Sequence, residues 1–60
     1  MIDKLIKFCL DKRLNFSVGS YNNKTSIVVD FLTHYYSADI DDEKELEEVY
    51  NCVIEEVNKL

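Results

Sequence analysis

The spacing of the apolar residues changes twice along this chain of 60 residues, and this feature most constrains the fold. From Ile2 to about Arg13 the spacing is helical, with charged side chains on the opposite face. From Leu14 the apolar residues alternate with small or polar ones, which is the pattern of a half-buried strand. From about Asp42 to Lys59 the helical spacing returns. The sequence therefore predicts a helix, a β-region and a second helix.

The β-region is predicted to be an antiparallel hairpin. The segment from Tyr21 to Lys24 contains two asparagines, which tolerate the positive φ angles of tight turns. The second strand is predicted to run from Thr25 to about Thr33, with Tyr36 as its outer limit, because β-branched and aromatic residues dominate it. The side chains expected to face one common side are those of Phe16, Val18, Ile27, Val29 and Phe31.

A two-stranded hairpin is only marginally stable by itself in water, so both helices are expected to pack on one of its faces. The predicted fold is one small α+β domain, residues 1–60, with the order α-β-β-α. A domain of this size buries only about 60% of the surface that its unfolded chain exposes. Since such a core leaves no room for a deep substrate pocket, we do not expect an enzyme.

Apolar residues also occupy the outer face of the predicted hairpin, where polar residues are usual. Val28 and Leu32 flank Asp30 on this face. We therefore expect a homodimer that pairs the hairpins edge to edge or covers this face. The alternative is a monomer in which Tyr35, Tyr36 and the connecting loop fold over these residues. The residues expected to mediate self-association are Val28, Leu32 and Tyr36.

The negative charge is concentrated in the last third of the chain. Residues 39–60 contain nine acidic and two basic residues, whereas residues 1–38 contain three acidic and five basic ones. The acidic face of the last helix could bind a basic groove on a protein partner and compete with nucleic acid for it. The simpler interpretation is that like charge keeps the helix soluble. The residues predicted to bind a partner are Asp41, Glu45, Glu48, Glu55 and Glu56.

Residues suited to catalysis or metal binding are sparse. His34, the only histidine, follows Asp30 by four positions, about 13 Å along a regular strand, and Cys9 lies on the apolar stripe of the first helix. Cys9 and Cys52 lack the paired spacing of zinc ligands, and Asp39–Glu43 lacks the central glycine of a calcium loop. No catalytic residue, metal or cofactor is predicted.

Two alternatives to a protein-binding module remain. One is nucleic-acid binding, in which tyrosines stack on bases beside the basic N-terminal part, although phosphate-binding domains usually carry positive net charge and this chain carries −5. The other is a structural accessory homodimer without separable activity. The residues of the nucleic-acid alternative are Lys4, Lys7, Lys12, Arg13, Lys24, Tyr21, Tyr35 and Tyr36.

The first ten residues carry charges at Asp3, Lys4 and Lys7, so they lack the uninterrupted apolar core of a secretory signal. The longest uncharged apolar run is also too short to span a bilayer. We therefore expect a cytoplasmic protein with reduced cysteines and no membrane partner.

In layout and composition the chain resembles the small acidic proteins of bacteriophages and mobile elements of low-GC Gram-positive bacteria. It is similar to some anti-CRISPR proteins, which open with a short helix (here IDKLIKFCLDKRL), continue into strands (NFSVGS and TSIVVDFL) and add acidic helices (DDEKELEEVYNCVIEEVNKL). The resemblance covers the whole chain as layout and composition. It implies a phage-encoded inhibitor that binds a host protein, such as one that handles nucleic acid, and blocks it without catalysis.

Overall fold

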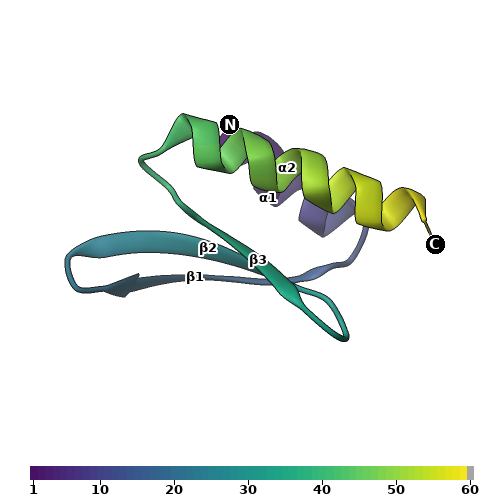
Figure 1. The fold of residues 1–60 in the computed structure, drawn as a ribbon, viewed down its shortest axis with the longest axis horizontal. Helices are drawn as coiled ribbons and strands as arrows, with labels where there is room; N and C mark the ends of the chain where they lie inside the picture. Colours follow the sequence, from purple (N-terminus) through teal and green to yellow (C-terminus); the bar gives the residue numbers. More distant parts are fainter. Residues whose placement is uncertain (60) are drawn as a thin grey trace.

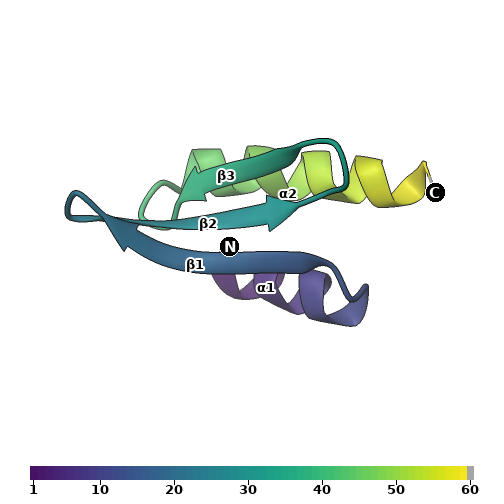
Figure 2. The same ribbon diagram turned by 90° about the horizontal axis from the view of Figure 1, so that it is seen from below.

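The computed structural model describes residues 1–59, which form a three-stranded antiparallel sheet with two helices on one of its faces (Figures 1 and 2). The strands lie side by side in chain order, and the order of elements along the chain is α-β-β-β-α. The elements are α1 (Ile2–Asp11), β1 (Asn15–Tyr21), β2 (Lys24–Asp30), β3 (Tyr35–Asp39) and α2 (Glu43–Asn58). The predicted α+β class is confirmed, as is the antiparallel hairpin packed by two helices, but the sheet has one strand more than the sequence indicated.

The segment predicted as one long second strand is divided into two strands. β2 ends at Asp30, and the chain then reverses to form β3. In the turn that follows, the Phe31 N–H donates to the His34 carbonyl oxygen at 2.8 Å. The chain then returns as β3, with Tyr36 opposite Val29. This turn contains neither glycine nor proline, the residues that most clearly mark chain reversals. Since β-forming residues continue through it, the sequence pattern did not indicate a turn here.

The same turn corrects the predicted self-association surface of Val28, Leu32 and Tyr36. A single long strand would place all three on the outer face, away from the helices. Because the chain reverses, Tyr36 instead pairs with Val29, which is buried, and therefore lies on the inner face. Leu32 lies fully exposed in the turn, and only Val28 is on the outer face of the sheet. The three residues do not form one surface.

The hairpin of β1 and β2 turns at Asn22 and Asn23, as the sequence predicted. Their φ angles are 51° and 63°, the left-handed values that a type I′ turn requires at both central residues. This turn places Tyr21 opposite Lys24, and the register continues without a bulge along all of β1. The hairpin end extends beyond the helices (Figure 1), so Val18 on the inner face remains 50% exposed.

α1 ends in a Schellman motif, which directs the chain into β1. The Leu14 N–H donates to the Cys9 carbonyl oxygen (2.8 Å), and the Arg13 N–H donates to the Leu10 carbonyl oxygen (3.2 Å). Arg13 has a φ of 57°, a left-handed conformation in which glycine is the usual residue. The motif places Leu14 beside the β-sheet rather than on a further helical turn.

α2 begins where the sequence predicted. The Asp42 carboxylate accepts hydrogen bonds from the Lys44 and Glu45 backbone N–H groups, both at 3.1 Å, and so caps the helix. Acidic residues in the first turn also interact favourably with the helix dipole. The apolar stripe of α2 then faces the sheet.

The core lies between the sheet and the two helices. Its buried side chains come from α1, β2, β3 and α2, and β1 contributes only partly buried ones. They are Leu5, Cys9, Ile27, Val29, Ala38, Leu46, Val49 and Val53. Both cysteines are free thiols. Neither helix of the described residues combines the length and the apolar character needed to cross a membrane.

Candidate functional site

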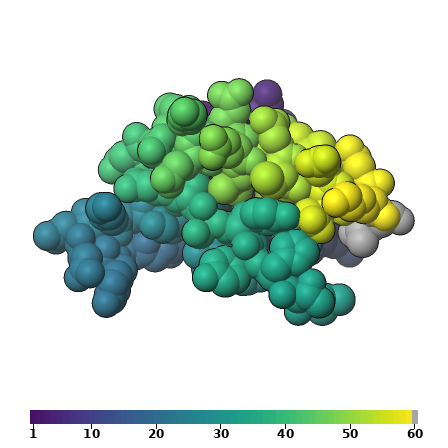
Figure 3. All heavy atoms as spheres, in the orientation of Figure 1, coloured from purple at the N-terminus to yellow at the C-terminus, as the bar shows by residue number. Residues whose placement is uncertain are grey.

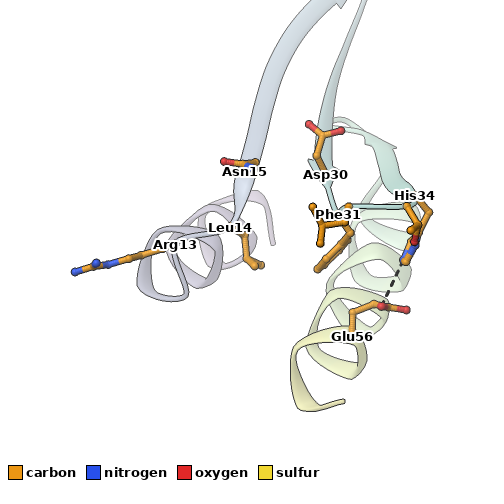
Figure 4. A pocket seen from close by; sticks show the side chains of 9 residues that line it. Arg13, Leu14, Asn15, Asp30, Phe31, His34 and Glu56 are labelled. Carbon is orange, nitrogen blue, oxygen red and sulfur yellow. Dashed lines mark hydrogen bonds and ion pairs between the residues drawn. The ribbon is translucent and has the colours of Figure 1, made fainter. Parts of the chain in front are cut away.

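One open groove of about 460 Å³ lies where the start of β1, the turn between β2 and β3, and the last half of α2 meet (Figure 4). Apolar side chains of Leu14, Phe31 and Leu32 contribute to its walls, and polar side chains surround them. The lining residues are Arg13, Leu14, Asn15, Asp30, Phe31, Leu32, Thr33, His34 and Glu56. The Arg13 side chain points away from the groove (Figure 4).

Three rings pack together beside this groove. Phe31 and His34 are stacked, with centroids 5.4 Å apart, and Tyr36 meets both rings edge to face, at 5.9 and 5.3 Å. Offset-stacked and edge-to-face arrangements are the favourable ones for aromatic rings. The cluster holds the turn between β2 and β3 in place, which explains how that turn forms without glycine or proline.

Glu56 of α2 joins this ring cluster to the helix layer. Its Oε1 accepts a hydrogen bond from the Tyr36 hydroxyl at 3.1 Å, and its Oε2 lies 3.4 Å from His34 Nε2 (Figure 4). The contact with His34 is an ion pair when the imidazole is protonated. Desolvation raises the pKa of Tyr36, and the nearby carboxylate of Glu56 raises it further. Glu56 therefore has structural partners, and it does not belong to a free acidic surface.

His34 and Glu56 do not form a nucleophilic centre with Cys9, the cysteine considered in the sequence analysis. Cys9 is fully buried in the core, where desolvation raises the pKa of its thiol. The carboxylate beside His34 belongs to Glu56 rather than to Asp30. Thr33 Oγ1 lies 3.0 Å from His34 Nδ1, but both residues are exposed in the turn, and we interpret this contact as fixing the ring orientation. Over residues 1–59 no three potential metal ligands of the His, Cys, Asp or Glu type lie together.

The other predicted partner-binding residues, Asp41, Glu45, Glu48 and Glu55, are exposed on or just before α2. We call these four residues the acidic surface; α2, on which three of them lie, forms the upper face of the molecule in Figure 3. Glu45 also accepts a hydrogen bond from the Asp39 N–H at 3.1 Å. Within residues 1–59, the only carboxylates within 4.0 Å of a cationic group are those of Glu43 and Glu56, so no ion pair neutralises the acidic surface.

The residues of the nucleic-acid alternative do not gather on one surface, although Tyr21 and Lys24 lie opposite each other at the hairpin turn. The exposed lysines of α1 lie on the side of the helix away from the core, and the Lys4 ammonium sits over the Tyr50 ring at 5.3 Å. Tyr21 and Tyr35 are exposed on the opposite, outer face of the sheet. Tyr36 is on the inner face. Base-stacking rings and the basic residues of α1 therefore do not share one surface.

Sequence reasoning missed the contact of Glu56 with His34 and Tyr36. These residues are 20 or more positions apart, and no local pattern connects them. One weak signal was available, because Glu56 lies at the margin of the apolar stripe that contains Val49 and Val53. A carboxylate at such a margin can contact polar groups of the neighbouring layer.

No family model matches the sequence, and neither the curated proteins nor the solved structures contain a significant match.

Proposed function

We propose that this chain is a non-enzymatic protein-binding module that binds a basic surface of another protein through the acidic surface of α2. The observation that supports the proposal is the absence of neutralising partners for Asp41, Glu45, Glu48 and Glu55 within residues 1–59. Residues 39–60 carry nine acidic side chains against two lysines, so exposed carboxylates that form no ion pair leave a local negative potential, which accelerates encounter with a complementary surface.

The partner class follows from this charge. Proteins that bind nucleic acid present basic surfaces to phosphate groups, and an acidic helix can occupy the same surface. The proposed activity is therefore competition with nucleic acid for a host protein, which agrees with the phage-inhibitor resemblance in layout and composition. No covalent chemistry is required of the chain.

The test is binding of the immobilised chain to a panel of purified bacterial nucleic-acid-binding proteins with basic surfaces, followed by displacement with a DNA or RNA oligonucleotide. The variant Glu48→Gln/Glu55→Gln removes two charges of the acidic surface. An exposed ion pair contributes up to about 1 kcal/mol, so losing two is expected to weaken binding about tenfold.

The matched control is Asp3→Asn/Asp11→Asn, which makes the same change of net charge on exposed positions of α1. It is expected to retain binding close to that of the unmodified chain. Equal losses in both variants would mean that only net charge matters, and the proposed surface would then be wrong. Binding that the oligonucleotide does not displace would contradict the competitive mechanism.

A further inference from the structure

β1 is an edge strand whose own residues have none of the features that usually prevent another strand from pairing. It is seven residues long, pairs with β2 throughout without a bulge, and contains neither a charged residue nor a proline. Natural sheets usually protect their edges with charges, prolines, bulges or short strands. An unprotected edge of this length is a place where a further strand can add.

The hydrogen bonds of the sheet show which backbone groups of β1 face this edge. The Ile40 N–H donates to the Thr25 carbonyl oxygen and the Phe31 N–H donates to that of His34, so the odd-numbered residues of β2 bond toward β3. Bonding alternates along a strand, so the even-numbered residues of β2 bond toward β1, as the turn between Tyr21 and Lys24 also requires.

The odd-numbered residues of β1 lie opposite these even-numbered residues of β2 and bond to them. The N–H and C=O groups of Phe16, Val18 and Ser20 therefore point to the open edge. Within residues 1–59 these groups have no backbone partner in turns or loops and no side-chain partner. They form a regular row of unpaired donors and acceptors.

The other edge of the sheet is less open. By the same alternation, Asp39 of β3 points its N–H outward, and the Glu45 carboxylate already accepts that hydrogen bond at 3.1 Å. β3 has only five residues. α2 lies behind this strand (Figure 2), so a second copy added at β3 would bring two acidic helices together. Charge and hydrogen bonding therefore both favour β1 as the pairing edge.

We propose that β1 pairs antiparallel with β1 of a second copy, about a two-fold axis at Val18, to form one continuous six-stranded sheet. In this register Val18 faces Val18 of the partner subunit, and Phe16 faces Ser20 of the partner subunit. All three residues with outward backbone groups are then paired, so the strand is complementary to itself. The proposal is independent of the proposed function of α2.

Two further observations favour a second copy as the occupant. Val18 is an apolar residue that remains 50% exposed on the inner face, and this pairing brings two such side chains into contact. α2 lies behind β3, whereas α1 runs behind β1 and projects past its free edge (Figure 2), so the two acidic α2 helices are held at the outer ends of the combined sheet. The net charge of −5 on each chain is thus kept away from the interface.

The experiment is light scattering after size-exclusion chromatography over a range of protein concentrations. The unmodified chain is expected to reach twice its monomer mass of 7.1 kDa. Val18→Lys and Val18→Glu each place like charges opposite one another in the proposed register, and each is expected to raise the dimer dissociation constant roughly 10- to 100-fold. An equimolar mixture of the two variants is expected to form a heterodimer. Circular dichroism verifies that both variants are folded.

Ser37→Lys is the control, because it adds a charge at the exposed β3 edge and is expected to leave the dimer intact. A chain that stays monomeric at every concentration would overturn the proposal. So would dimers that persist in Val18→Lys, or a failure of the two charged variants to pair with each other. Capture of the α2 partner is expected to survive in the Val18 variants, so the failure of either proposal can be distinguished from the failure of the other.

Discussion

Replacing Arg13 with glycine is expected to stabilise the fold, although the change removes a side chain. Arg13 has a φ of 57°, and a left-handed conformation costs a residue with a Cβ about 1–2 kcal/mol. Glycine avoids this cost but loses about 0.5–1 kcal/mol more conformational entropy on folding. The difference predicts a gain of about 0.5–1 kcal/mol in the free energy of unfolding. The Arg13 guanidinium makes no ion pair within the described residues, so its loss does not offset this gain.

The matched control is Lys12→Gly, which also removes one positive charge from the end of α1. Lys12 has a φ of −95°, where glycine relieves no strain, so this variant is expected to lose about 0.5–1 kcal/mol. Urea and thermal unfolding, followed by circular dichroism, measure both variants at one protein concentration, because self-association would link stability to concentration. For a domain of this size the expected rise in Tm for Arg13→Gly is roughly 2–8 °C.

The reasoning would be refuted if Arg13→Gly destabilised the protein as much as Lys12→Gly. That result would mean that the Arg13 side chain stabilises the protein by more than the strain of its backbone costs.

Two further predictions concern the contacts of α2. Asp42→Ala removes the helix cap and is expected to lower the free energy of unfolding by about 0.5–2 kcal/mol. Asp41→Ala makes an equal change of charge and is expected to lower it much less. Similar losses of both variants in urea unfolding would show that charge rather than capping matters. The pKa of Tyr36 is raised in the folded state, so its contribution to stability is complete below pH of about 10 and is lost as pH rises through the folded pKa. Stability measured from pH 7 to about 11 is therefore expected to fall more steeply in the unmodified chain than in Tyr36→Phe, and parallel curves would contradict the assigned contact.

The sequence contained enough information to place both helices and the hairpin turn. Helical spacing located the buried face of α2, Asp42 marked its start, and Asn22 and Asn23 marked the turn. These features depend on backbone preferences and side-chain periodicities that act over a few neighbouring residues. The charge distribution likewise placed the acidic residues on the last helix.

The turn at residues 31–34 was decided by tertiary structure. Phe31 and His34 pack on Tyr36, and Glu56 of α2 contacts His34 and Tyr36, so the stability of the turn depends on residues far along the chain. Without these long-range contacts, the segment from Thr25 to Tyr36 resembles one strand. A prediction that omits the turn places Tyr36 on the outer face, whereas it lies on the inner face opposite Val29.

The open edge of β1 and the groove beside Glu56 are also consequences of tertiary structure. The residues of a strand show which side chains point to the same face of the sheet. Whether the strand lies at an edge depends on which other strands pair with it. The sequence by itself determined the two helices, the hairpin turn and the polarity of each helix face. The tertiary structure decided which faces and edges remained free, because those depend on contacts between residues distant in the chain.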